Sequence, residues 1–151
     1  MIYRFADITD INLLVSKRPE FIEVGEEDTN YKEIEDNCFC YFEKAMRENT
    51  CDIILAEEDG TCIGTGIIFY YESVPSGFNV SGKNSYITSM YVKPNFRRRG
   101  IARTMLYKLI KKALEKGYKI IMLNASEMGK PLYEKMGFVE SRNGMILEVR
   151  S

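Results

Sequence analysis

The sequence predicts an α/β fold in which helices cover a mixed sheet. Strand-like and helix-like apolar patterns follow one another in the order β-α-α-β-β-β-α-β-α-β-β. The 151 residues, 45% of them hydrophobic, suit a single domain spanning residues 1–151. No internal repeat, low-complexity segment or linker interrupts the chain. These three observations together favour one core built around one sheet.

The first third of the chain predicts a strand and two helices. Residues 2–5 form a short apolar run, and apolar positions in residues 11–15 have helical spacing in a helix expected to end before Pro19. Residues 20–29 are acidic without a period and are expected to form a loop. Residues 31–49 repeat apolar side chains every three or four positions, which predicts an amphipathic helix.

The middle of the chain predicts three strands. Residues 53–56 and 62–71 are rich in Ile, Phe and Tyr, and the Asp-Gly pair within residues 58–61 is typical of a tight hairpin turn. A long loop over residues 73–83 should precede the next strand, over residues 86–92.

The last third predicts a helix, a strand, a short helix and a closing pair of strands. From Ile101 an apolar stripe runs opposite a row of lysines, and Gly117 is the expected cap. A strand over residues 120–124 and a helix over residues 131–136 follow. The final two strands should join at Arg142-Asn143-Gly144.

Composition excludes several classes of function. Lys plus Arg total 21 and Asp plus Glu total 22, so the net charge of -1 gives no support for nucleic acid or an anionic membrane as partner. The chain has no histidine, which excludes Ser-His-Asp and Cys-His catalysis and imidazole metal ligands. Without a CxxC pair, the four cysteines predict no zinc site. With no leader pattern and no apolar run near the ~20 residues that span a bilayer, we expect a cytoplasmic protein with reduced thiols.

The chemistry is concentrated in residues 86–104, where a strand leads through a short turn into a helix. A helix start leaves backbone N–H groups unpaired and carries partial positive charge, so it suits an anion. Gly100 permits close backbone approach, Ala102 keeps the next turn small, and four arginines add charge: Arg97, Arg98, Arg99 and Arg103. These features favour a phosphate or pyrophosphate ligand. Solvated surface charge and a nucleic-acid patch are the alternatives, and neither a Walker nor a Rossmann glycine motif is present.

Two motifs resemble the GNAT (GCN5-related N-acetyltransferase) family. Arg97-Arg98-Arg99-Gly100-Ile101-Ala102 matches the family's Q/R-x-x-G-x-G/A pattern, and residues 132–138, LYEKMGF, are similar to its LYEKxGF segment. The element order is similar to that family over essentially the whole chain. The resemblance implies a mostly antiparallel sheet in which strands 86–92 and 120–124 splay apart.

The resemblance implies acetyl-CoA as co-substrate, with no metal. Its pantetheine arm would pair with the backbone of the strand, and its diphosphate would lie at the helix start. A hydroxyl at Ser126, where the family has Asn, or the side chain of Asn124 would bond the arm. The cofactor-binding residues implied are Met90, Tyr91, Val92, Arg97, Arg98, Arg99, Gly100, Ile101, Ala102, Arg103, Thr104, Asn124, Ser126 and Tyr133.

The resemblance also implies catalytic roles. Tyr133 matches the tyrosine that protonates the leaving thiolate, although it could merely pack and bond the sulfur, and a backbone N–H near Met90 would stabilise the oxyanion. Residues 84–92 contain no Glu to act as the usual base, so Glu72 or an ordered water is expected to deprotonate the amine.

The acceptor is expected to be a polar or cationic amine rather than an acidic compound. Acidic residues far outnumber basic ones over residues 20–59, and the balance reverses over residues 93–119. The carboxylates expected to attract the amine are Glu23, Glu26, Glu27, Asp28 and Glu33. Aromatic side chains that could wall the pocket are Phe39, Tyr41, Phe42, Tyr70, Tyr71 and Phe78, of which Phe39 and Phe42 better suit the core.

The expected function is therefore acetyl-CoA-dependent N-acetylation of a small primary amine by direct attack on the thioester. Acetylation of a protein N-terminus or lysine is one alternative, and a non-catalytic acyl-CoA sensor is another. Because family members are often dimers, a homodimer is one expected state.

Overall fold

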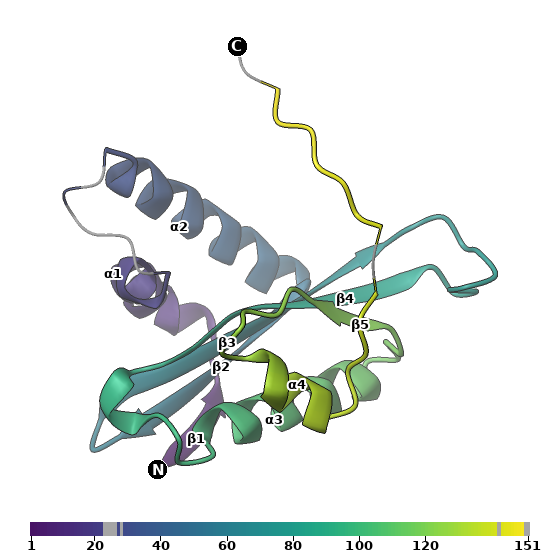
Figure 1. Cartoon of the computed structure of the whole chain (residues 1–151). Coiled ribbons are helices and arrows are strands. Elements are labelled where there is room, and N and C mark those ends of the chain that lie inside the picture. The colour runs from purple at the N-terminus through teal and green to yellow at the C-terminus, as the bar shows by residue number, and fades with distance from the viewer. Residues whose placement is uncertain (23–26, 28, 142, 150–151) are drawn as a thin grey trace.

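The computed structural model describes residues 1–22, 27, 29–141 and 143–149. Its elements follow the predicted order as far as the fourth helix (Figure 1). They are β1 (Ile2–Phe5), η1 (Ile8–Asp10), α1 (Ile11–Phe21), α2 (Tyr31–Glu48), β2 (Cys51–Glu58), β3 (Thr61–Glu72), β4 (Lys83–Val92), η2 (Pro94–Phe96), α3 (Ile101–Glu115), β5 (Ile121–Leu123) and α4 (Lys130–Lys135).

The five strands form one mixed sheet in the order β1-β2-β3-β4-β5. All neighbours are antiparallel except β4 and β5, which are parallel. The predicted tight turn joins β2 to β3, where Asp59 and Gly60 adopt φ of 50° and 77°. Both values lie in the left-handed region that Asp-Gly hairpin turns need.

Helices cover both faces of the sheet, and each face has its own apolar core (Figure 1). Successive side chains of a strand point to opposite faces, so Ile53 and Leu55 of β2 pack toward α1 and α2. Ile54, between them, packs with Met105 and Leu109 of α3 on the other face. All five side chains are at most 1% exposed, which fixes the register of the central strands.

The predicted splay between β4 and β5 is confirmed. The two strands pair at Ser85–Ile87 with Ile121–Leu123, and the pairing ends there while β4 continues to Val92. On the other side of β4, Thr65 opposes Tyr91 and Ile67 opposes Thr88. Two residues of β4, Ser89 and Met90, therefore oppose Gly66 alone. This β-bulge holds Ser89 at φ 56° and changes the direction of the strand where the gap begins.

The end of α1 corrects one expectation, because the helix continues through Pro19 to Phe21. A proline in the last turn removes only one hydrogen bond of the helix. Pro19 and Phe21 are both buried, so packing offsets that loss.

The two strands predicted at the C-terminus are not formed in the described part of the chain. Residues 139–141 and 143–149 adopt no regular structure, and Arg142 of the predicted turn lies outside the described residues. Met145 and Ile146 are 98% and 90% exposed. A lone two-stranded ribbon is only marginally stable in water, and the edge strand β5, with three residues, offers it few backbone partners. Within the described residues, no helix is both long and apolar enough to cross a membrane.

Candidate active site and acceptor pocket

The gap beside β4 is the first component of the site. From Thr88 to Val92, no described strand pairs with the edge of β4 that faces β5. Backbone N–H and C=O groups require partners, and an extended ligand carrying amides can supply them as an added strand would. Met90, Tyr91 and Val92, three of the predicted cofactor-binding residues, all lie on this stretch.

Gly66 allows the bulge to pack closely against β3. A Cβ atom at Gly66 would lie 2.4 Å from Met90 Sδ and 3.1 Å from Leu109 Cδ1. The Met90 side chain therefore fills the space that a larger residue on β3 would occupy.

The N-terminus of α3 provides an open anion site at the end of the same gap. Gly100 caps the helix with φ 78°, and no described side chain caps it. The first turn contains no acidic residue. A Cβ on Gly100 would meet nothing within 4 Å, so the space before the helix is open. Thr104 donates both its backbone N–H and its hydroxyl to the Gly100 carbonyl, at 3.1 and 3.0 Å, so both donors already have a partner within the helix.

The arginines of this loop divide into two kinds. Arg97 donates from Nε to the Val92 carbonyl at 2.8 Å and lies 5.7 Å from the centre of the Tyr91 ring, so it ties the loop to the end of β4. Arg98, Arg99 and Arg103 are exposed, and Arg99 stacks over Phe96 at 5.2 Å. The exposed three are free to meet an anion at the helix start. Ile101 is buried and Ala102 half-buried, and both present backbone rather than side chain there.

Tyr133 lies on α4, half-buried against the α3 face of the sheet. Its ring meets Phe138 edge-on at 6.0 Å, and a Cβ at Gly129 would lie 2.9 Å from its Cε2 atom. No described group hydrogen-bonds to its hydroxyl. Burial raises the pKa of Tyr133, so the hydroxyl keeps its proton at neutral pH. A neutral phenol of this kind can donate a proton to a leaving thiolate.

The two polar candidates after β5 are placed differently. Asn124 follows β5 directly and is exposed. The Ser126 hydroxyl accepts a hydrogen bond from the Gly129 backbone N–H at 3.1 Å, which stabilises the turn into α4.

Glu72 is not brought together with the other candidates. It ends β3 opposite Lys83, at the far end of β4, and is exposed. Ser89 lies six positions after Lys83 along β4, a span of roughly 20 Å. A general base at Glu72 would be out of reach of a thioester held beside Met90.

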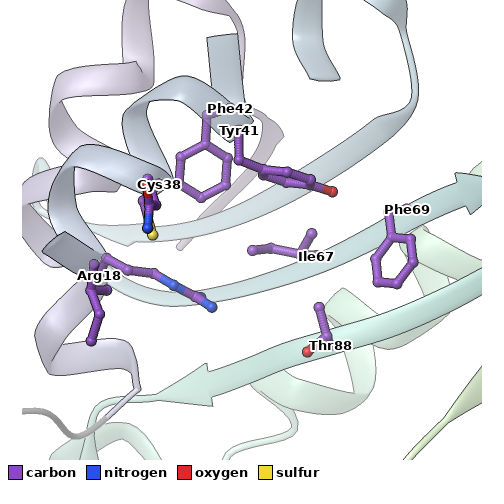
Figure 2. A pocket seen from close by; sticks show the side chains of 9 residues that line it. Arg18, Cys38, Tyr41, Phe42, Ile67, Phe69 and Thr88 are labelled. Atoms are coloured by element: carbon purple, nitrogen blue, oxygen red, sulfur yellow. The ribbon is translucent and has the colours of Figure 1, made fainter. Parts of the chain in front are cut away.

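A pocket of about 440 Å³ opens on the other face of the sheet, under α2 (Figure 2). It reaches β4 at Thr88, the first residue beyond the β4–β5 pairing. Arg18 of α1 reaches the same point and donates from Nη1 to Ser89 Oγ at 2.8 Å. The cofactor gap and this pocket therefore meet at one bulge of β4. The residues lining the pocket are Arg18, Ile34, Asn37, Cys38, Tyr41, Phe42, Ile67, Phe69 and Thr88.

The predicted acceptor residues are only partly gathered there. Tyr41 and Phe42 line the pocket, while Phe39 lines a second hollow between α1 and α2. Tyr70 is buried and donates to Asp52 at 2.7 Å, and Tyr71 and Phe78 are exposed elsewhere. Of the carboxylates, Glu27 and Glu33 are exposed and neither lines the pocket, whereas Glu23, Glu26 and Asp28 lie outside the described residues.

Sequence reasoning missed Arg18, Thr88 and Ser89. An arginine beside a proline and a Thr-Ser pair within a strand match no motif. Only the β4 bulge and the end of α1 bring them together. The bulge is marked by the positive φ of Ser89, which is uncommon for a serine in a strand. A serine in the sequence gives no sign of that backbone angle, so the bulge could not be predicted.

Comparison with known proteins agrees with this geometry. The model of the acetyltransferase (GNAT) family matches residues 13–138. A predicted acetyltransferase from Clostridium acetobutylicum, solved with acetyl-CoA, is 34% identical, with a TM-score of 0.85 over 97% of this chain and 95% of that one. A GCN5-related N-acetyltransferase from Ralstonia eutropha JMP134, 24% identical over 97% of each chain, shares the fold with a TM-score of 0.83.

A curated relative matches over a shorter stretch. Thialysine N-epsilon-acetyltransferase from Sus scrofa is 29% identical over 85 residues, or 54% of this chain and 47% of the relative. The match thus spans about half the length of that relative. The family model covers most of the chain, and the solved structures repeat its fold from end to end. The chain belongs to the GNAT acetyltransferase family.

Proposed function

We propose that this chain is an acetyl-CoA-dependent N-acetyltransferase that acts on the primary amine of a small, polar acceptor. The observation that carries the proposal is the meeting of two sites at the β4 bulge: an unpaired strand edge on one side and a pocket on the other. The acetyl-CoA solved in the Clostridium acetobutylicum relative supports the choice of cofactor.

The cofactor is held by backbone at both ends of the gap. Met90 and Val92 pair with the pantetheine amides, and Tyr91 lies between them on the same edge. The N–H groups at the start of α3 bind the diphosphate, with Arg98, Arg99 and Arg103 supplying charge. Asn124 faces the arm from the end of β5.

Acetyl-CoA supplies a thioester whose carbonyl carbon the neutral amine attacks directly. A backbone N–H at the Met90 bulge stabilises the negative charge that develops on the carbonyl oxygen. Tyr133 gives its proton to the sulfur as the C–S bond breaks, and the new C–N bond leaves an amide. An ordered water takes the proton from the amine, since none of the described lining residues is a carboxylate.

A thiol-release assay tests the proposal. Purified protein is mixed with acetyl-CoA and a panel of small amines, and free CoA thiol is followed with a chromogenic reagent. Loss of a general acid costs on the order of 100-fold or more in rate, so Tyr133→Phe should lower kcat by that factor. Its Kd for acetyl-CoA, measured by calorimetry, should stay within about twofold of wild type.

Tyr107→Phe is the matched control, because Tyr107 is 58% exposed on the outer face of α3. It should keep wild-type kcat and Kd. Calorimetric heat without thiol release for any amine would indicate the acyl-CoA sensor instead. Turnover of peptides in preference to free amines would indicate a protein acetyltransferase, although a pocket volume of about 440 Å³ suits a small molecule.

We further propose that the chain forms a homodimer. The exposed apolar side chains near its C-terminus support this proposal: Met145, Ile146, Leu147 and Val149 are between 84% and 98% exposed. Such a run is seldom left in water when a second copy can cover it. Light scattering of wild type and of an Ile146→Lys, Leu147→Lys variant tests it, with a monomeric wild type as the contrary result.

A further inference from the structure

The acceptor pocket carries a charge opposite to the one that the acidic first half of the chain suggests. Arg18 is the one charged side chain in its described lining, which otherwise consists of apolar, aromatic and neutral polar groups. Figure 2 shows the Arg18 side chain pointing from α1 toward Ile67 and Thr88. A cationic substrate would be repelled there, and an anionic group would be attracted.

The guanidinium of Arg18 has no carboxylate partner among the described residues. It donates from Nη1 to the neutral hydroxyl of Ser89, at 2.8 Å. Arg4, in contrast, pairs with Asp10 and Glu57 at 2.8 Å each. A guanidinium presents five N–H donors in a planar fork that suits carboxylate oxygens, so most donors of Arg18 remain available to a ligand.

The anion site and the reaction centre lie at the same point of the sheet. Ser89, which holds Arg18, belongs to the bulge that opens the cofactor gap. Thr88, its neighbour, lines the pocket. An acceptor whose carboxylate binds Arg18 while its amine attacks the thioester beside Met90 must therefore carry these two groups close together.

The remaining walls suit an apolar group. Phe69, Ile67 and Phe42 line the pocket beyond Thr88, and Tyr41 closes it from α2 (Figure 2). Burial raises the pKa of Tyr41 to about 12, so its side chain is uncharged at neutral pH. The positive charge of Arg18 opposes this rise, which shows that Arg18 acts on Tyr41 electrostatically.

Building on the proposed function, we propose that the acceptor is an α-amino acid with an apolar or aromatic side chain. Arg18 binds its α-carboxylate, the α-amine faces the cofactor gap at Ser89, and the side chain packs against Phe69 and Tyr41. The transfer forms a C–N bond at the α-amine and breaks the thioester C–S bond, with one proton lost from nitrogen and one gained by sulfur.

Three acceptors test the proposal in the wild-type protein: phenylalanine, phenylalaninamide and 2-phenylethylamine. The amide loses the negative charge, and the phenylethylamine loses the whole carboxylate. Hydrogen bonds to a charged group are worth on the order of 10- to 100-fold in affinity, so kcat/KM should be higher by that factor for phenylalanine. The amine of phenylalaninamide is less basic than that of phenylalanine, so a larger fraction of it is neutral and reactive at pH 8. This difference alone would favour the amide, so a higher kcat/KM for phenylalanine would not be caused by amine basicity.

Variants identify the residue responsible. Arg18→Met should raise KM for phenylalanine about 10- to 100-fold and leave KM for 2-phenylethylamine unchanged, while Arg18→Lys should fall between. Lys17→Met removes a neighbouring charge of α1 that pairs with Glu20 at 3.8 Å and should change neither. Unchanged thermal unfolding and acetyl-CoA affinity would show that Arg18→Met is folded.

The outcomes separate the two proposals. Thiol release that is equal for phenylalanine and 2-phenylethylamine would overturn the amino-acid inference and leave the acetyltransferase standing. Equal losses on both acceptors in Arg18→Met would also overturn it, since they would indicate a role in holding the bulge. No thiol release with any of the three or with the wider amine panel would overturn the acetyltransferase itself.

Discussion

Gly66→Ala is a direct test of the bulge on which both halves of the site depend. The added Cβ would lie 2.4 Å from Met90 Sδ, 3.1 Å from Leu109 Cδ1 and 3.3 Å from Ile54 Cγ2. Leu109 and Ile54 are fully buried, so neither can move aside freely. Met90 must yield, because its thioether is the far end of a flexible side chain and is the one of these three neighbours able to move.

The magnitude follows from overpacking in a filled core. Inserting one methyl group without free volume costs about 1–3 kcal/mol, partly offset by about 0.5 kcal/mol because glycine is unfavourable inside a strand. A net loss of about 1–2 kcal/mol lowers Tm by roughly 2–8 °C in a chain of this size. Moving the Met90 side chain out of its place beside the bulge should also raise KM for acetyl-CoA, because the Met90 backbone is the proposed partner of the pantetheine arm.

Calorimetry and the thiol-release assay measure the two effects. Gly77→Ala is the matched control: it lies in the exposed β3–β4 loop, and an added Cβ would meet nothing within 4 Å. It should leave Tm and KM unchanged. A double mutant with Met90→Ala should be less unstable than the sum of the single mutants by about 0.5 kcal/mol or more, because both changes act on one contact. Strict additivity, or a wild-type Tm for Gly66→Ala, would refute the reasoning.

Three further predictions concern acid stability, thiol reactivity and the anion site. Hydrogen bonds from Arg4 hold the pKa of Asp10 below its usual value. The ionised Asp10 therefore stabilises the fold fully above about pH 4, and this contribution is lost as the pH falls. Asp10→Asn should make the free energy of unfolding depend less on pH between pH 2 and 6. A thiol reagent at pH 8 should label exposed Cys40 at once, and Cys51, whose pKa burial raises to about 11, only on unfolding; equal rates in native protein would contradict this. An alanine Cβ at position 100 would meet no neighbour, but φ of 78° is unfavourable for any residue with a side chain. Gly100→Ala should therefore lower the free energy of unfolding in urea by about 1–2 kcal/mol and weaken CoA binding in calorimetry. Unchanged stability and unchanged CoA affinity would count against Gly100 as the helix cap.

Local patterns were enough to predict most of the fold. The apolar stripe from Ile101 predicted α3, and the Asp59-Gly60 pair predicted the β2–β3 turn, because each is decided by neighbours in sequence. The anion-binding start of α3 was predictable for the same reason. It depends on a helix boundary and on Gly100, which lie within a few residues of each other.

Features that depend on distant partners were not predictable in this way. Pro19 stays helical because its ring is buried by packing that the local sequence does not reveal. The C-terminal strands have strand-like composition, but a strand also needs a neighbour to pair with, and the edge strand β5 is only three residues long. Glu72 was selected by its nearness in sequence to β4, whereas antiparallel pairing with Lys83 places it at the opposite end of that strand.

The charge of the acceptor side shows the same distinction between sequence and geometry. Acidic residues are numerous on α2, but Asp36 pairs with Lys32 and Glu43 with Arg47 at one-turn spacing on exposed surface. Such pairs are screened by water and contribute little field inside a pocket. Arg18, a single residue without a described counter-charge, faces the pocket interior, where screening is weaker. A count of charges along the chain therefore favours a cationic acceptor, whereas their orientation favours one that presents a carboxylate to Arg18. If orientation governs, raising ionic strength should weaken the preference for phenylalanine over 2-phenylethylamine only slightly.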